Sequence, residues 1–246
     1  MEDIKRIAGI EEIYLFDRVT STNTIARKLI PRKRSALILA QEQTRGRGRF
    51  ERRWYSPKGG LWFSLLLFPK RDIEPQLFTL LSSLALSQSL EELTHLPSYI
   101  RWPNDVLLDG KKVAGILCER IKGAMIIGIG INVNQEKFPP SLPSATSLKK
   151  ETGKEYNPEH ILKRFFSYFK YYEENLQSQR FSSLKEKIKE KSSLLLRFVT
   201  VDTGDKKLTG TVMDIDNQGR LVLRLDSGKE LYLSSGEVKE VEWSSA

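Results

Sequence analysis

The spacing of apolar and polar residues over the first three quarters of the chain predicts both strands and helices. Continuous apolar runs predict buried strands, and apolar residues that recur every three or four positions predict helices. Strands are expected at Glu12–Asp17, Ala36–Gln41, Leu61–Phe68 and Ala124–Asn134. Helices are expected after a cap at Thr20 or Ser21, over Pro75–Leu93 with an amphipathic pattern, and over Pro158–Asn175 and Phe181–Glu190. The mixture predicts an α+β fold.

Turn signals organise the remaining pattern. Asp109 and Gly110 lie between the apolar runs "VLL" and "VAGILC", and such a pair favours a type I′ hairpin because both turn positions need positive φ. After Ser193, short strand patterns alternate with the turn signals "NQG" and "SGK", which is typical of a small antiparallel barrel. We therefore expect a large domain over residues 1–193 and a small β-barrel domain over residues 194–246.

Charge and cysteine content narrow the class of protein. The formal net charge is +9, so the surface attracts nucleic acid, nucleotides or an acidic protein partner. The single cysteine, Cys118, excludes a disulfide scaffold and fits a reducing compartment. No run of 18 apolar residues occurs, so no membrane contact is expected. We expect a cytoplasmic protein.

The stretch "TRGRGRFERRW", from Thr44 to Trp54, contains five arginines. Apolar runs on both sides make it a connection between strands and not a free tail. Gly46 and Gly48 allow the backbone to approach a ligand, and several guanidinium groups together can bind one phosphate or carboxylate. Two other interpretations stay open, namely a solvated basic loop and an RNA-binding arginine-rich segment.

The motif "RWPND" and the lysine after the hairpin turn form a second candidate. Pro103 disfavours the helical region for Trp102, so Asn104 and Asp105 fall at the start of a strand. This carboxylate and amide could hold a Mg²⁺-bound nucleotide or accept a proton. The hairpin returns Lys112 toward Asp105, where an ammonium group could neutralise a carboxylate or phosphate. The alternatives are a simple Asn-Asp turn and ordinary turn lysines.

Glycines within apolar strands form a third candidate. Gly128 and Gly130 leave one face of their strand bare, and Gly115 does so on a neighbouring strand. Together they predict a slot against the sheet for a flat group. "GIGINVN" lacks the third glycine of a dinucleotide fingerprint, and no Walker P-loop occurs. The two histidines, His95 and His160, lie far apart, so no protein metal site is expected.

Four motifs occur in order: "GRGR" followed by Arg-Trp, "RWPND", "KKVAGILCE" and "GIGINVN". With "STN" at 21–23 and "QTRG" at 43–46, this order resembles the biotin–protein ligases, also called biotin–[acetyl-CoA-carboxylase] ligases, over nearly the whole chain. The resemblance implies a mixed sheet flanked by helices, as in the biotin/lipoate ligase catalytic domain. It also implies that the C-terminal barrel is SH3-like.

The resemblance implies a reaction in two steps. The carboxylate of biotin attacks the α-phosphate of ATP, which gives biotinyl-5′-AMP and pyrophosphate. A lysine amine of a biotin carboxyl carrier protein domain then attacks this intermediate and releases AMP. Because a carboxylate and a triphosphate repel each other, cations must lie between them. ATP with Mg²⁺ is the expected cofactor, and biotin is the expected substrate.

The matching motifs also imply residue roles. The expected catalytic residues are Arg47, Arg49, Asp105 and Lys112. The expected biotin-binding residues are Ser21, Thr22, Asn23, Gln43, Gly46, Arg47, Arg49, Lys112, Gly115, Leu117, Gly128 and Gly130. The expected ATP-binding residues are Arg52, Trp54, Asn104, Asp105, Lys112 and Asn132.

Two positions depart from the family pattern. Arg101 stands where lysine is usual, which retains the charge, and Glu51 stands near a usual glycine of the arginine loop. Barely twenty residues precede Ser21, so we expect the monofunctional form without a DNA-binding domain and no DNA partner. A homodimer is left open. The rival functions are a lipoate–protein ligase, which also makes an acyl-adenylate, and a basic nucleic-acid-binding module.

Overall fold

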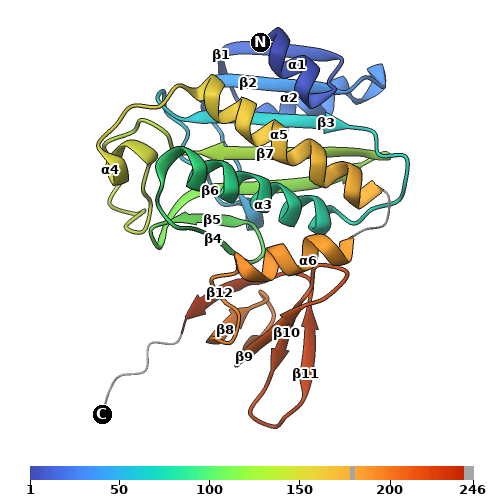
Figure 1. The fold of residues 1–246 in the computed structure, drawn as a ribbon, viewed down its shortest axis with the longest axis vertical. Coiled ribbons are helices and arrows are strands. Elements are labelled where there is room, and N and C mark those ends of the chain that lie inside the picture. The colour runs from blue at the N-terminus through green and yellow to red at the C-terminus, as the bar shows by residue number, and fades with distance from the viewer. Residues whose placement is uncertain (178–180, 241–246) are drawn as a thin grey trace.

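A seven-stranded mixed sheet forms the centre of the larger part of the molecule (Figure 1). The structure is a computed structural model that describes residues 1–177 and 181–240. The strand order is β1-β2-β3-β7-β6-β5-β4. β1 and β2 pair in parallel, and the other neighbouring strands are antiparallel. The strands are β1 (Glu12–Val19), β2 (Ala36–Gln43), β3 (Leu61–Leu67), β4 (Ser98–Arg101), β5 (Asp105–Leu108), β6 (Lys111–Ile121) and β7 (Ala124–Ile131).

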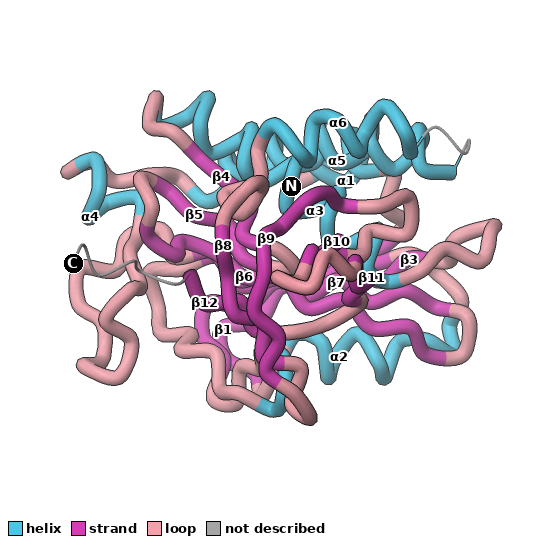
Figure 2. The backbone as a smooth tube through the Cα atoms, turned by 90° about the horizontal axis from the view of Figure 1, so that it is seen from below, coloured by secondary structure: helices cyan, strands magenta, loops and turns pink. Residues whose placement is uncertain are grey.

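Helices cover the two faces of this sheet unequally. Figure 2 shows α1, α3 and α5 on one side and α2 on the other. Successive side chains of β3 point to opposite faces of the sheet. On one face, the ring centre of Phe63 lies 5.6 Å from that of Phe165 of α5, and on the other face Ser64 forms hydrogen bonds with residues of α2. The helices are α1 (Glu2–Ala8), α2 (Thr22–Leu29), α3 (Pro75–Thr94), α4 (Leu148–Thr152), α5 (Pro158–Gln177) and α6 (Phe181–Glu190), with short 3₁₀ turns at Ile30–Arg32 and Arg49–Glu51. Among these helices, none combines the length and apolar character needed to cross a bilayer.

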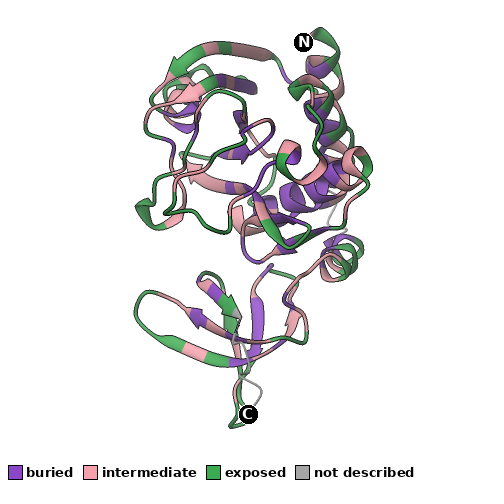
Figure 3. Ribbon diagram, turned by 90° about the vertical axis from the view of Figure 1, so that its left-hand side faces the viewer, coloured by how far each residue is buried: buried purple, intermediate pink, exposed green. Residues whose placement is uncertain are grey.

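Five antiparallel strands form a separate sheet after α6 (Figure 3). They are β8 (Phe198–Asp202), β9 (Lys207–Ile215), β10 (Leu221–Arg224), β11 (Glu230–Leu233) and β12 (Glu237–Glu240), in the order β11-β10-β9-β8-β12. The Trp102 indole NH donates to the Gly219 carbonyl at 3.0 Å and so connects the two sheets. The α+β class with a separate antiparallel C-terminal sheet is confirmed. The boundary at residue 193 stays a prediction, and the end of the strand expected at "EVKEVEW" lies outside the described residues.

The strands and helices expected from the pattern are present, and one detail was wrong. The segment predicted as an amphipathic helix is buried on most sides. Three of its buried serines, Ser82, Ser83 and Ser89, donate to carbonyl groups of their own helix. Ser82 Oγ, for example, donates to the Phe78 carbonyl at 2.7 Å, which satisfies the hydroxyl without water. Ser21 is the N-cap of α2, but its side chain makes no capping bond. The Asp109–Gly110 turn has the expected positive φ values, 49° and 76°.

Candidate active site

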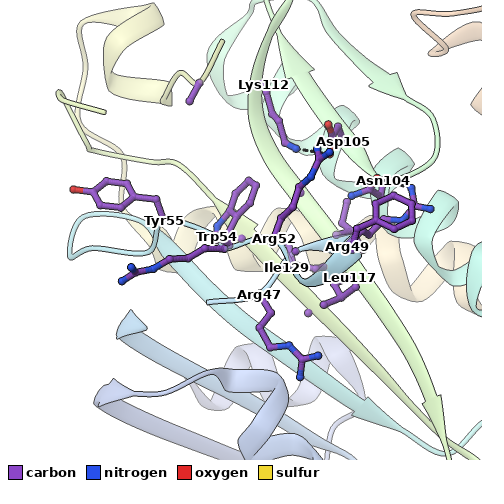
Figure 4. A pocket seen from close by; sticks show the side chains of 18 of the residues that line it. Arg47, Arg49, Arg52, Trp54, Tyr55, Asn104, Asp105, Lys112, Leu117 and Ile129 are labelled. Carbon is purple, nitrogen blue, oxygen red and sulfur yellow. Dashed lines mark hydrogen bonds and ion pairs between the residues drawn. The ribbon is translucent and has the colours of Figure 1, made fainter. Parts of the chain in front are cut away.

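A pocket of about 440 Å³ lies on the α2 side of the sheet (Figure 4). The ends of β5 and β6, the glycines of β7, the arginine loop and the start of β12 surround it. Every predicted site residue lines this pocket except Gly46. A Cβ at Gly46 would lie 2.5 Å from the Trp54 carbonyl oxygen and 2.5 Å from Ser56 Oγ. Gly46 therefore permits a close contact within the loop and does not reach the pocket.

Lys112 and Asp105 form an ion pair inside the pocket. The hairpin of β5 and β6 brings Lys112 Nζ to 2.7 Å from Asp105 Oδ1, as the sequence predicts. Figure 4 shows the side chain of Lys112 directed toward Asp105, with the contact drawn as a dashed line. The contact is not a well-aligned hydrogen bond, so Asp105 Oδ1 keeps unused accepting capacity. Lys112 Nζ also lies 5.3 Å from the centre of the Trp54 ring, a cation–π contact.

Two arginines of the arginine loop form ion pairs with carboxylates of the chain. Arg47 pairs with Glu51 at 3.0 Å, and Arg52 donates two bonds to the Glu237 carboxylate of β12, at 2.8 and 2.5 Å. Phe50 and Glu51 both have positive φ, 53° and 57°. Side chains other than glycine rarely adopt this region. The replacement of a family glycine near Glu51 therefore falls on a bend that suits glycine.

Arg49 is a half-buried cation of the loop. Its Nη1 donates to the Gly236 carbonyl oxygen at 3.1 Å and to Asn104 Oδ1 at 3.4 Å. Burial lowers the pKa of Arg49, and the nearby charges of Asp105 and Glu237 act in the opposite direction. Because its hydrogen bonds go to neutral oxygens, this half-buried guanidinium can still bind an anionic ligand.

The indole ring of Trp54 occupies the slot over the glycines. A Cβ at Gly130 would lie 2.3 Å from Trp54 Nε1, and one at Gly115 would lie 3.0 Å from Trp54 Cζ3. The bare glycine faces thus make room for the indole. Trp54 Nε1 is buried without a hydrogen-bond partner. Such a donor is costly to leave unpaired, so the site suits a ligand that supplies an acceptor.

A buried polar cluster closes the pocket beside α2. Gln43 Oε1 accepts from the Thr22 amide at 2.8 Å and lies 3.1 Å from the Thr22 hydroxyl. Ser64 Oγ lies 2.7 Å from Thr22 Oγ1 and 2.6 Å from Asn23 Oδ1. Ser64 was not among the predicted site residues. The sequence feature that could have indicated Ser64 is its place as the single polar residue in the apolar run "LWFSLLLF".

Two further segments line the pocket and were not predicted to do so. One is the loop after β7, which contributes Phe138, Ser141, Leu142, Ser144 and Ala145. It is joined to β6 because the Lys112 amide donates to the Ser144 carbonyl at 3.0 Å. The other is the start of β12, which contributes Gly236, Glu237 and Val238. Local sequence patterns carry no signal for such long-range contacts.

Within the part of the chain that the structure describes, the side chains offer neither a cluster of metal ligands nor a reactive thiol. In residues 1–177 and 181–240, no group of three or more His, Cys, Asp or Glu side chains is placed to hold a metal ion. Cys118 Sγ lies 3.2 Å from Met125 Sδ. Burial raises the pKa of the Cys118 thiol far above its usual value, so the thiol stays protonated at neutral pH.

Replacement of Glu237 by glutamine is expected to change stability little. The Arg52–Glu237 pair is largely exposed, and such pairs contribute about 0–1 kcal/mol. The free energy of unfolding from urea titration should therefore fall by less than about 1 kcal/mol. Asp214→Asn is the matched control, because its partner Lys185 is more enclosed. If Glu237→Gln lowers the free energy of unfolding more than Asp214→Asn does, the Arg52–Glu237 pair is a main structural contact.

Comparison with known proteins identifies the family of the chain. Residues 15–136 match the model of the biotin/lipoate A/B protein ligase family, and residues 197–239 match that of the biotin protein ligase C-terminal domain. The chain belongs to the biotin/lipoate protein ligase family. It is 33% identical to the biotin–[acetyl-CoA-carboxylase] ligase of Paracoccus denitrificans, over 87% of this chain and 95% of that protein. It is 33% identical to the bifunctional ligase/repressor BirA of Bacillus subtilis, over 94% of this chain and 75% of that protein.

Solved structures show the same fold. The biotin protein ligase from Aquifex aeolicus in complex with biotin and ATP has a TM-score of 0.85 and 32% identity, over 94% of this chain and all (100%) of that one. The biotin protein ligase from Leishmania major in complex with biotinyl-5-AMP has a TM-score of 0.63 and 25% identity, over 91% and 99% of the two chains. The resemblance inferred from the motifs is confirmed.

Proposed function

We propose that this chain is a biotin–protein ligase, which activates biotin with ATP and transfers it to a lysine of a biotin carboxyl carrier protein domain. The observation that carries the proposal is the gathering of Lys112, Arg49 and Arg52 around one pocket with a glycine floor. Two of these cations now pair with carboxylates, those of Asp105 and Glu237. A ligand carboxylate and phosphates would take the place of these partners.

In the first step, the carboxylate of biotin attacks the α-phosphorus of ATP, and the bond to pyrophosphate breaks. Lys112 and Arg49 reduce the repulsion between the two anions and stabilise the charge that develops at the phosphoryl oxygens. Trp54 must leave part of the glycine slot as the ligands enter, because its ring lies against Gly115 and Gly130. The indole then becomes a surface on which the adenine can stack.

In the second step, the amine of the carrier lysine attacks the acyl carbon of biotinyl-5′-AMP. The amide bond forms, the anhydride C–O bond breaks, and AMP leaves. Asp105 is the proposed acceptor of the amine proton, because its Oδ1 is buried without a well-aligned hydrogen bond. The arginine loop excludes water, which protects the adenylate from hydrolysis.

We propose that Mg²⁺ enters bound to ATP. Mg²⁺ keeps several waters and is held by phosphates with one or two carboxylates, so Asp105 alone would suffice on the protein side. The proposed reaction takes place in the cytoplasm and involves neither DNA nor a membrane. A homodimer stays a prediction.

Mass spectrometry of a carrier domain incubated with this protein, biotin and Mg-ATP tests the proposal. The carrier should gain the mass of one biotinyl group, and a carrier with arginine in place of its acceptor lysine should gain none. If lipoate but not biotin supports exchange of pyrophosphate into ATP, the chain is a lipoate ligase. If neither does, and the chain binds RNA with an affinity that falls steeply with salt, the nucleic-acid interpretation holds.

A further inference from the structure

A continuous hydrogen-bond network runs from the arginine loop through the closed end of the pocket to the outer side of α2. Its members are Ser56, Gln43, Thr22, Ser64, Asn23, Glu119 and Arg27. Glu119 of β6 and Ser64 of β3 do not line the pocket, whereas Thr22, Asn23 and Gln43 do. The network therefore joins the pocket lining to groups behind it.

Glu119 determines how the Asn23 amide is oriented. Asn23 Nδ2 donates to Glu119 Oε2 at 3.1 Å, and the other oxygen of Glu119 accepts from Arg27. A carboxylate paired with arginine only accepts hydrogen bonds, so the NH₂ group of Asn23 must face it. The Asn23 carbonyl oxygen then points toward Ser64 and the glycine floor. A Cβ at Gly128 would lie 2.1 Å from that oxygen.

This orientation fixes the direction of the neighbouring hydroxyl protons. Asn23 Oδ1 can only accept, so the proton of Ser64 Oγ, 2.6 Å away, is directed to it. Gln43 Nε2 donates to Ser56 Oγ at 3.0 Å, so Gln43 presents its oxygen to Thr22. The Thr22 hydroxyl donates its proton to Gln43 Oε1 at 3.1 Å. Neither hydroxyl has a proton left to donate into the pocket.

We propose that Glu119, held by Arg27, is a positioning residue that makes the closed end of the pocket accept hydrogen bonds, and so selects a ligand head group with N–H donors. A cyclic urea, the head group of biotin, offers two such donors in a rigid ring. The inference rests on the proposed function, since it explains how that site recognises one end of its substrate. With the amide turned over, an NH₂ group would face the ligand donors instead.

Glu119→Gln tests the proposal with the least change in shape. Glutamine has one accepting oxygen where the site needs two, so either Arg27 or the Asn23 amide loses its acceptor. The KM for biotin should rise about 5- to 30-fold, the ratio that corresponds to one buried hydrogen bond. The kcat at saturating biotin and the KM for ATP should change less than about twofold, since Glu119 lies outside the pocket.

A double variant supplies the rescue. Asn23→Asp alone places two carboxylates side by side and should weaken biotin binding. Asn23→Asp combined with Glu119→Gln exchanges the amide and the carboxylate between the two positions. The new amide at position 119 would donate to the new carboxylate at position 23, while its oxygen accepts from Arg27. The double variant keeps an accepting oxygen directed toward Ser64 and the pocket. The KM of the double variant for biotin should therefore be at least about threefold below that of either single variant.

Asp72→Asn is the matched control. Asp72 pairs with Arg120 on the same strand as Glu119, but it lies on the surface and does not line the pocket. This variant should keep the KM for biotin of the unchanged protein. Thermal unfolding of all variants shows whether each one is folded.

Two results would overturn the inference. One is a folded Glu119→Gln variant that binds biotin as tightly as the unchanged protein. The other is a double variant that is no better than the single variants, since a merely structural role predicts additive losses. Failure of the proposed function is distinguishable, because the unchanged protein itself would then show no biotin binding in calorimetry.

Discussion

Lys112→Ala is expected to lower the rate of biotinyl-5′-AMP formation by about 10²- to 10³-fold, as the loss of one preorganised charged donor does. Lys112 is the cation that the hairpin places at 2.7 Å from the Asp105 carboxylate, within the pocket. Without it, the two anionic substrates lose their shared counter-ion, and Asp105 adds an unpaired negative charge. Biotin-dependent exchange of labelled pyrophosphate into ATP measures the effect.

Lys111→Ala is the control for this prediction. Lys111 is the neighbouring lysine on β6, but it is exposed and pairs with Glu151 outside the pocket. Its replacement should leave the exchange rate within about twofold, because exposed ion pairs contribute little. Equal losses in the two variants, or near-normal exchange in Lys112→Ala, would remove Lys112 from the mechanism.

Gly128→Ala is expected to weaken biotin binding by about 5- to 150-fold, which corresponds to the usual 1–3 kcal/mol for overpacking a filled site. The added methyl group would lie 2.1 Å from Asn23 Oδ1. Asn23 cannot move aside freely, because Ser64 and Glu119 hold both ends of its amide. Isothermal titration with biotin measures the loss.

Two further variants distinguish a steric effect of the added methyl group from the loss of a contact between Asn23 and biotin. Gly48→Ala also adds a methyl group to the pocket lining, but its nearest neighbour would lie 3.6 Å away, at the Arg52 carbonyl oxygen. It should bind biotin nearly as well as the unchanged protein. Gly128→Ala combined with Asn23→Ala should recover thermal stability and not biotin affinity. Recovery of both would mean that the Asn23 amide makes no contact with the ligand.

The elements and the central hairpin were predictable because their signals are local. The Asp109–Gly110 pair specifies its turn without reference to the rest of the chain, and the positive φ values agree. The ion pair of Lys112 with Asp105 follows from that hairpin. Most of the residues that line the pocket were named from short motifs through the resemblance to the biotin–protein ligases, and their roles stay predictions.

The remaining features depend on contacts between distant segments. The indole of Trp54 lies over Gly130, a residue of another strand, and sequence patterns give no indication of that pairing. No sequence pattern distinguishes Ser64 and Glu119 from other strand residues, and only the fold places both beside Asn23. The buried serines of α3 were misread for a related reason, because a hydroxyl that bonds within its own helix needs no solvent.

The bonds from Arg49 and Arg52 to the start of β12 span 187 and 185 positions of the chain. One wall of the pocket is therefore synthesised well after the sheet that forms its floor. A nascent chain that contains only the seven-stranded sheet already has the glycine floor, Lys112 and the arginine loop. It still lacks the oxygens of Gly236 and Glu237, which bond to Arg49 and Arg52 of that loop. Catalytic competence is expected to appear only after β12 has left the ribosome and paired with the arginine loop.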